Sequence, residues 1–176
     1  TLQTGTTSIG GSLTLSGTAS TTTVVGTTIG GNLNIGDGTS FTTEAYNLTV
    51  TGTTTIGGGS SGNLTIGAYN GTKIFTGLVT INAGGTWNNS VSSPVTFRGG
   101  ITNNGTFTAG NTYTYTFDTN AQSLNGNLNM SGSTVVVTGI NLTNYGTLTL
   151  GSALNGTGAL INSSSGTLNI EGSGYI

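Results

Sequence analysis

The chain is 176 residues long and consists mainly of four residue types, with 39 Thr, 33 Gly, 20 Asn and 18 Ser. It carries only two basic and four acidic side chains, too little positive charge for binding to a nucleic-acid backbone. Low charge together with many β-branched residues argues against disorder. No stretch combines Ala, Glu, Lys and Leu at the 3.6-residue period of a helix, which argues against long helices. Short β-strands separated by Gly, Asn and Ser turns are therefore expected.

The first recurring element is a five-residue pattern of the form Gly-x-Leu-x-(Leu/Ile/Met). It occurs as GSLTL at 11–15 and returns twenty residues later as GNLNI at 31–35. The preceding segments also match, as GTTSIGG at 5–11 and GTTIGG at 26–31. A longer version, GTTTIGGGSSGNLTIG at 52–67, carries an insertion of Gly and Ser. An interval of about twenty residues thus organises this part of the chain.

The same interval is regular again near the C-terminus. The pattern reads GNLNM at 126–130, GTLTL at 146–150 and GTLNI at 166–170. Further short strands are predicted between these copies, at 134–137 and 140–143. In every copy, apolar and polar residues alternate, which puts the Leu and Ile side chains on one face of a strand.

A repeating unit of this size predicts an all-β fold, a parallel β-solenoid of the right-handed β-helix kind with coils of about 20 residues. Residues 1–176 would form a single domain in which equivalent apolar residues stack along the axis. About nine coils at a spacing of about 4.8 Å would give a rod about 40 Å long. The alternative is an antiparallel β-sandwich, because Asn-Gly pairs favour hairpins and AQSLNGNLNM at 121–130 can form one.

The section at about 69–118 departs from the repeat and holds Lys73, Arg98 and most of the large aromatic residues. Three of them are candidates for stacking on sugar rings: Trp87, Tyr113 and Tyr115. Their alternative roles are to fill a wider section of the core or to form a subunit contact.

Enzymatic activity is not expected. The chain has no His and no Cys, which removes imidazole and thiolate chemistry. The carboxylates are scattered rather than clustered, at Asp37, Glu44, Asp118 and Glu171. We therefore expect no catalytic residues, no metal ligands and no cofactor.

Ice binding is a more distant hypothesis, because a flat solenoid face with regularly spaced Thr residues can bind ice. The polar position inside each repeat is occupied by a mixture of Thr and Asn: Thr14, Asn34, Thr65, Asn129, Thr149 and Asn169. A mixed row of this kind is a weaker indication than a regular Thr-x-Thr array.

The Gly-x-Leu-x-(Leu/Ile/Met) copies, with NNGTFTAG at 103–110 and LNGTGALINSSSGTLNI at 154–170, resemble the repetitive β-helical regions of bacterial surface proteins. These include autotransporter passengers, filamentous-haemagglutinin-like adhesins and extracellular filament or sheath subunits. The resemblance implies export to the cell surface and a structural or adhesive role, with self-association or surface carbohydrate as partners. A signal peptide is expected to be absent or already removed, and no run of apolar residues is long enough to cross a membrane as a helix.

Residues near the C-terminus are candidates for self-assembly. Leu168 and Ile170 would lie in the inward row of the last coil, and Tyr175 and Ile176 follow as apolar, strand-like residues. Glu171 is the only charged residue in this region that could oppose strand pairing at an edge. We therefore predict an extracellular structural protein that assembles head to tail into a filament or surface fibre, or alternatively a glycan-binding adhesin. With no His and few carboxylates, its stability is predicted to be nearly flat from about pH 5 to 9.

Overall fold

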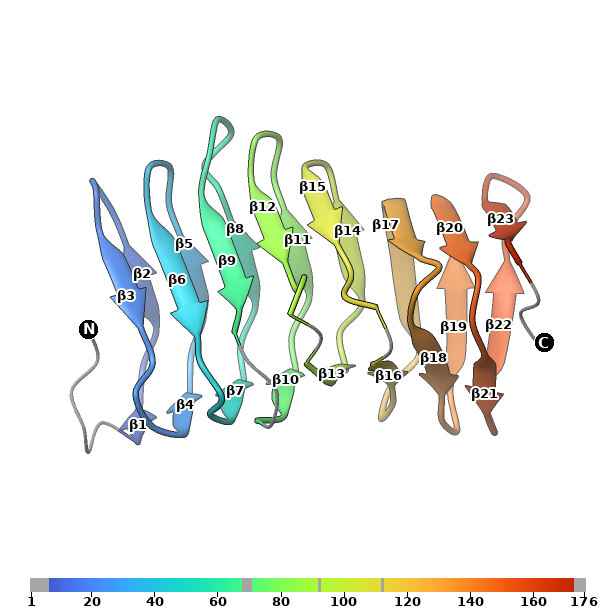
Figure 1. Cartoon of the computed structure of the whole chain (residues 1–176), viewed down its shortest axis with the longest axis horizontal. Helices are drawn as coiled ribbons and strands as arrows, with labels where there is room; N and C mark the ends of the chain where they lie inside the picture. The colour runs from blue at the N-terminus through green and yellow to red at the C-terminus, as the bar shows by residue number, and fades with distance from the viewer. Residues whose placement is uncertain (1–6, 68–70, 92, 112, 173–176) are drawn as a thin grey trace.

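The structure, a computed structural model, describes residues 7–67, 71–91, 93–111 and 113–172. Within these ranges the chain forms 23 strands and no helix, and each strand pair is parallel (Figure 1). The strands are two to four residues long, with β17 an exception at nine residues. Strands this short gain stability chiefly from stacking on their neighbours, as in repeat proteins generally.

Three faces wind around one core. The first face contains β1 (Ser8–Ile9), β4 (Thr27–Ile29), β7 (Leu48–Val50), β10 (Lys73–Phe75), β13 (Val95–Phe97), β16 (Thr114–Phe117), β18 (Thr134–Val137) and β21 (Leu154–Gly156). The second face contains β2 (Leu13–Leu15), β5 (Leu33–Ile35), β8 (Thr54–Ile56), β11 (Val79–Ile81), β14 (Ile101–Asn103), β17 (Gln122–Met130), β19 (Asn141–Asn144) and β22 (Ala159–Asn162). Together they give eight coils, numbered here 1 to 8 from the N-terminus.

The third face consists of two separate sheets. Coils 1 to 5 contribute β3 (Ser20–Thr22), β6 (Ser40–Thr43), β9 (Asn63–Ile66), β12 (Thr86–Asn88) and β15 (Thr106–Thr108). Coils 6 to 8 contribute the second half of β17, β20 (Thr147–Leu150) and β23 (Thr167–Ile170). Among the described residues, no strand pairing joins the two sheets.

The predicted parallel β-solenoid is confirmed, and the antiparallel sandwich is wrong. The structure has eight coils rather than nine, which corresponds to a rod of about 38 Å at about 4.8 Å per coil. The hairpin alternative for 121–130 is also wrong, because this segment is the single strand β17. β17 bends from the second face to the third at Gly126, whose φ of 83° is readily adopted by glycine.

The twenty-residue repeat has a structural counterpart at both ends of the chain. On the second face, Leu13 pairs with Leu33, and on the third face Leu128 pairs with Leu148, which pairs with Leu168. The similar sequence copies therefore lie on two different faces. Of the two other strands predicted near the C-terminus, 134–137 is β18 as expected, and 140–143 is β19, shifted by one residue.

The insertion at 57–62 changes the alignment expected in coil 3. Leu33 pairs with Thr54 rather than with Leu64, so the TTI segment of β8 continues the second face. Leu64 lies on the third face, where it pairs with Phe41. The Gly- and Ser-rich insertion lengthens the corner between the second and third faces. The Leu-rich copy that follows it, β9, therefore lies on the third face.

The core consists of stacked rows of inward-facing residues. On the first face, one row runs through Ile29, Val50, Phe75, Phe97, Phe117 and Val137, all of which are buried. The residue between inward positions faces outward, as Thr49 and Thr96 do on either side of Ile74. Because apolar residues alternate with polar ones along each strand, the inward residues of successive coils stack into a continuous apolar interior.

Candidate functional site

The last coil exposes residues whose counterparts one coil earlier are buried. In coil 7, Leu142, Leu148 and Leu150 are at most 3 % exposed. Their partners in coil 8 are Leu160 and Leu168, which are half-buried, and Ile170, which is 42 % exposed. Among the described residues, β22 and β23 have no strand partner on their far side. The inward apolar row is therefore open at this end of the rod.

The first coil is also partly open, although Leu15 on β2 is only 3 % exposed. Ile9 and Leu13 are half-buried, whereas their partners in coil 2, Ile29 and Leu33, are fully buried. Strands β1, β2 and β3 lie at the edges of their sheets among the described residues. Each end of the described rod thus presents three strand edges (Figure 1), and its apolar interior is partly exposed.

The candidate assembly residues are only partly covered by the structure. Leu168 and Ile170 both lie on β23 and belong to the open inward row, as the alternation in the sequence predicts. Tyr175 and Ile176 lie outside the described residues. No charged side chain occurs in the sequence from 8 to 22 or from 154 to 170, so Glu171, directly after β23, is the nearest charge that could oppose edge pairing.

Two of the three proposed sugar-stacking residues are buried. Trp87 and Tyr115 are both 0 % exposed, so neither ring can stack on a sugar, and their assignment to the core is correct. Tyr113 is half-buried and directly precedes β16. Alternation along TYTYTF groups these residues on one face, but it cannot tell whether that face points inward or outward.

The aromatic residues pack across coils 4 to 6. The Trp87 ring lies 5.1 Å from Phe75, 5.5 Å from Phe97 and 5.9 Å from Phe107, measured between ring centroids. Phe97 also stacks on Phe117 at 5.5 Å. Spacings in this range are favourable for aromatic pairs, so this cluster is a major stabilising element of the middle coils.

A polar network accompanies Tyr115 into the core. The Tyr115 hydroxyl accepts a hydrogen bond of 2.8 Å from Nδ2 of Asn89. The Asn89 side chain also bonds to the Ser93 backbone, both as a donor to the carbonyl and as an acceptor from the amide, at 3.0 Å each. Burial raises the pKa of Tyr115 to about 12, although the hydrogen bond from Asn89 opposes the shift. The hydroxyl is therefore a structural group and stays protonated at neutral pH.

Lys73 is a buried cation that the sequence does not identify as such. It occupies an inward position on β10, between Leu48 and Val95 of the adjacent coils, and it is 0 % exposed. Its Nζ donates to the carbonyl oxygens of Gly71 at 2.7 Å and Glu44 at 3.2 Å. Burial lowers the pKa of Lys73 to about 8, and the negative charge of Glu44 partly opposes this shift.

Lys73 and Tyr115 predict a maximum of stability in alkaline solution. Because the pKa of Lys73 is about 8 when folded and 10.5 as a free side chain, the unfolded state binds more protons between these values. The free energy of unfolding should therefore rise by roughly 2–3 kcal/mol over this range. Above about pH 10 it should fall, because unfolded Tyr115 ionises while the folded residue, with a pKa of about 12, keeps its proton.

Urea denaturation at intervals from pH 6 to 11 would measure this profile. In the Lys73→Met variant the rise above pH 8 should disappear, because no buried amine then titrates. A wild-type profile that stays flat to pH 10 would show that Lys73 is as solvated in the folded state as in the unfolded chain. Composition alone predicts a flat free energy of unfolding from about pH 5 to 9. The buried Lys73 adds a rise near the upper end of this range.

Asp37 anchors the insertion in coil 3. Its Oδ1 accepts hydrogen bonds from the backbone amides of Gly58 at 2.7 Å, Ser61 at 3.0 Å and Ser60 at 3.2 Å. These bonds, of which that from Ser61 has the largest effect, lower the pKa of Asp37 to about 2. Their contribution to stability is present above about pH 4 and is lost as the pH falls towards 2. This carboxylate therefore acts as a cap for the loop at 57–62.

Two of the other charged residues pair with each other. Arg98 and Asp118 form a half-exposed salt bridge, with 2.8 Å between Nε and Oδ1. Thr119, next to this pair, has a φ of 76°, which is unusual for a β-branched residue, and its hydroxyl donates to Oδ1 of Asp118 at 2.9 Å. Within the described ranges, no group of three or more His, Cys, Asp and Glu side chains could hold a metal ion.

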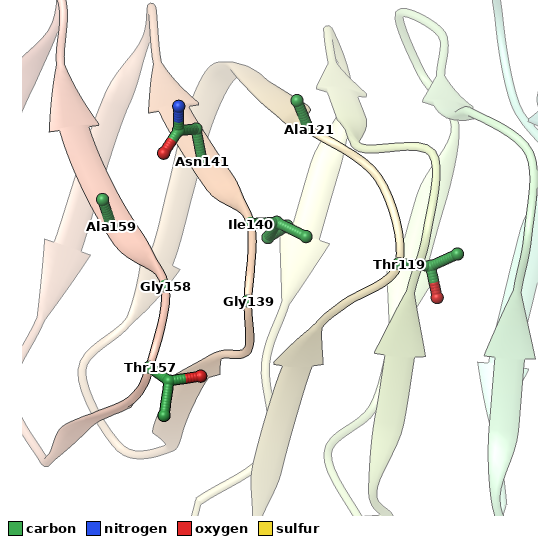
Figure 2. A pocket seen from close by; sticks show the side chains of 8 residues that line it. All are labelled: Thr119, Ala121, Gly139, Ile140, Asn141, Thr157, Gly158 and Ala159. Carbon is green, nitrogen blue, oxygen red and sulfur yellow. The ribbon is translucent and has the colours of Figure 1, made fainter.

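A large hollow of about 510 Å³ lies at the corner between the first and second faces in coils 6 to 8. Figure 2 shows the three corner segments side by side, with Gly139 and Gly158 contributing bare backbone to the surface. Its other lining residues are Thr119, Ala121, Ile140, Asn141, Thr157 and Ala159. Small residues create this hollow, and no titratable side chain lines it.

Outward Thr and Asn residues form a regular row on the second face. Thr14, Asn34, Thr55, Thr80 and Thr102 pair in register from coil 1 to coil 5. The Asn34 side chain donates to Thr14 Oγ1 at 3.2 Å, so polar residues bond along the axis. The six polar residues of the sequence copies do not form a single row, because Thr65 lies on the third face, as do Asn129, Thr149 and Asn169.

No protein-family model, curated protein or solved structure matches the chain. In the part of the chain that the structure describes, no helix is long and apolar enough to span a membrane.

Proposed function

We propose that the chain is an extracellular structural protein that stacks end to end with further copies of itself to form a filament or surface fibre. The observation that carries the proposal is the pair of open end coils. Each presents three parallel strand edges, a partly exposed apolar row and no charged side chain between its strands. Exposed edges of this kind pair readily with other strands.

The geometry of the two ends supports a stack that continues the rod. Coil 1 pairs with coil 2 at an offset of twenty residues on all three faces, as in Ser8 with Thr28, Thr14 with Asn34 and Thr21 with Phe41. At the other end, the offset is twenty residues on the third face, where Leu148 pairs with Leu168, but nineteen on the first face and eighteen on the second. Both end coils present strand edges on all three faces, so coil 1 of one copy can pair with coil 8 of another through parallel edges, as neighbouring coils do inside the rod. A contact between opposite ends is heterologous and produces an open filament.

The extracellular location rests on composition and on the β-solenoid architecture. The chain has no Cys, few charges and two Lys or Arg residues, so it offers few trypsin cleavage sites. These properties suit a protein outside the cell and agree with the resemblance to bacterial surface proteins. The adhesin alternative loses two of its three candidate residues, since Trp87 and Tyr115 are buried and Tyr113 alone is half-buried.

The test places charge on the inward row of the last coil. In a Leu168→Lys, Ile170→Lys variant, two ammonium groups would be buried against coil 1 of the next copy, at a cost that should prevent stacking. The matched control is Asn169→Lys, which adds charge to the same strand on its outward side. We expect fibres of the wild type and the control by electron microscopy, and monomers or short oligomers of the double variant.

Light scattering at high protein concentration would decide the proposal. Growth of the wild type with concentration, and its loss in the double variant alone, is the expected result. An intact chain that stays monomeric would overturn the filament proposal. Equal loss of assembly in Asn169→Lys would show that charge anywhere on β23 blocks association, and that stacking of the inward row is not the cause.

A further inference from the structure

The chain contains four Asn-Gly pairs, at 70–71, 104–105, 125–126 and 155–156. An Asn followed by Gly readily loses its side-chain amide, because Gly has no side chain to shield its backbone nitrogen from the carbonyl carbon of the Asn side chain. The reaction needs a free Gly N–H and room for the Asn side chain, so the folded structure decides which pair can react. Asn70 lies outside the described residues, and the other three pairs differ in both respects.

The pair at 104–105 is held by hydrogen bonds. The backbone N–H of Gly105 donates to Oδ1 of Asn103 at 3.1 Å. The N–H of Asn104 donates to the carbonyl oxygen of Ile81 at 2.8 Å. The Gly nitrogen of this pair is therefore occupied, although the Asn side chain is exposed.

The pair at 125–126 is held between two coils. It lies inside β17, where Gly126 pairs with Asn103 of coil 5. On its other side Gly126 touches coil 7, since a Cβ on Gly146 would overlap the backbone of Gly126. Ring closure at this pair would require both neighbouring coils to move.

The pair at 155–156 lies on β21, the last strand of the first face, at the C-terminal end of the rod (Figure 1). Asn155 pairs with Val136 at an outward position, and its side chain is exposed. The side-chain amide of Asn155 forms no hydrogen bond with any described residue. The Asn side chain of this pair is therefore free to turn.

The backbone N–H of Gly156 faces the open end of the rod. Across β18 and β21, the N–H of Val135 donates to the carbonyl oxygen of Ala153 at 2.9 Å. By alternation in a parallel ladder, the carbonyl of Asn155 also faces coil 7, and the N–H of Gly156 lies on the opposite side of the same trans peptide bond. Among the described residues, β21 has no strand partner on that side.

The surroundings of this pair also leave room for the reaction. A hollow of about 180 Å³ is lined by Asn155 and Gly156 together with Val137, Leu154, Gly158 and Leu160. Gly156 has a φ of 119°, and a Cβ there would overlap the carbonyl oxygen of Val137. The fold thus requires a Gly directly after an exposed Asn, and no side chain can shield the Gly nitrogen.

We propose that Asn155 is a modification site at which the chain converts itself to isoaspartate without an enzyme, and that this change prevents coil 8 from stacking on another copy. The N–H proton of Gly156 is taken by solvent, and the nitrogen attacks Cγ of Asn155. The Cγ–Nδ2 bond breaks, and Nδ2 takes a proton from water and leaves as ammonia. Water then opens the succinimide ring. Attack of water at Cγ gives Asp, whereas attack at the main-chain carbonyl carbon gives isoaspartate, in which the main chain runs through Cβ and Cγ.

The consequence for assembly rests on the proposed end-to-end stacking. Isoaspartate adds one carbon to the main chain of β21, which displaces the N–H of Gly156 relative to the backbone groups of Leu154 that face the same way. The strand edge then no longer matches the regular spacing of a parallel partner. In a stacked copy this edge is already paired, and pairing slows the local opening that the reaction needs. Free subunits should therefore lose the ability to assemble as they age, and stacked subunits should be protected.

The first measurement is independent of assembly. Dilute wild-type protein would be aged in warm, mildly alkaline buffer, and isoaspartate would be located in chymotryptic peptides by mass spectrometry with electron-transfer fragmentation. We expect isoaspartate to accumulate at Asn155 at least about tenfold faster than at Asn104 or Asn125, because the other two pairs must first break contacts. Equal rates at the three residues, or no isoaspartate at Asn155, would overturn the assignment of the site.

The second measurement compares assembly before and after ageing by light scattering. Aged wild type should lose assembly in proportion to its isoaspartate content. Aged Asn155→Gln should keep it, because Gln would have to close a six-membered ring, which is far slower. Fresh Asn155→Asp is the matched control, since it adds the charge without the extra backbone carbon, and it should assemble like the wild type.

The outcomes separate this proposal from the filament proposal. Aged protein that carries isoaspartate and still assembles would overturn the effect on assembly. Loss of assembly in fresh Asn155→Asp would also overturn it, because charge rather than the backbone would then be the cause. A fresh wild type that never assembles would overturn the filament proposal together with the effect on assembly, whereas the isoaspartate measurement would still decide the modification site.

Discussion

Replacing Trp87 with Ala is expected to lower the free energy of unfolding by about 4 kcal/mol, as for other large-to-small changes in well-packed cores. Trp87 is fully buried, and its ring contacts Phe75, Phe97 and Phe107 on three neighbouring strands. Its removal leaves a cavity that the rigid backbone of stacked coils cannot close. Urea denaturation followed by circular dichroism would measure the loss.

The matched control for this change is Ile74→Ala. Ile74 is a large apolar residue on the outward side of β10, next to the inward Phe75, and it should cost less than about 1 kcal/mol. A loss in Trp87→Ala no larger than in the control would mean that the middle coils repack around the cavity. Because Trp87 is the only Trp, its fluorescence gives a further check, and the wild-type emission should shift to longer wavelength on unfolding.

Replacing Gly126 with Ala is expected to cost at least about 3 kcal/mol, among the largest effects of a single methyl group in this chain. Gly126 has a φ of 83°, and a Cβ there would overlap the carbonyl oxygen of Asn103. Relief of this overlap requires the β14–β17 pairing to separate, which breaks the second face at the coil where the third face is already interrupted. Thermal melting would show the loss as a lower midpoint.

Gly139→Ala separates the two causes of this effect. Gly139 has a similar φ of 67°, but a Cβ there would meet no atom within 4 Å. This variant should lose only about 1 kcal/mol, the cost of a left-handed conformation for a residue with a side chain. Similar losses in the two variants would show that backbone conformation dominates, and that the contact with Asn103 contributes little.

The interval between repeats was enough to predict the class of fold. Leu13, Leu33 and Leu148, Leu168 recur every twenty residues in the sequence and pair at the same interval in the structure. In a parallel stack, each inward apolar residue lies on the equivalent residue of the previous coil. The register of strand pairing therefore appears in the sequence as a regular interval between apolar residues. The inward positions of Leu168 and Ile170 followed from the same alternation.

The alignment in the middle of the chain could not be predicted in this way. The insertion at 57–62 transfers a Leu-rich copy from the second face to the third, and residues of similar sequence then occupy different faces. A corner can absorb residues at little cost, because loop entropy grows slowly with length. Local sequence similarity therefore does not specify which face a strand joins.

By itself, the sequence determined that the chain is all-β, that it coils with a period of about twenty residues, and that neither end coil carries charge between its strands. Only the tertiary structure decided that Trp87 and Tyr115 point inward, that Lys73 is buried between Leu48 and Val95, and that the third face is interrupted between β15 and β17. Alternation specifies which residues share one side of a strand, but it does not specify whether that side faces the core or the solvent. The conformation of the corners decides this, and contacts between coils set that conformation.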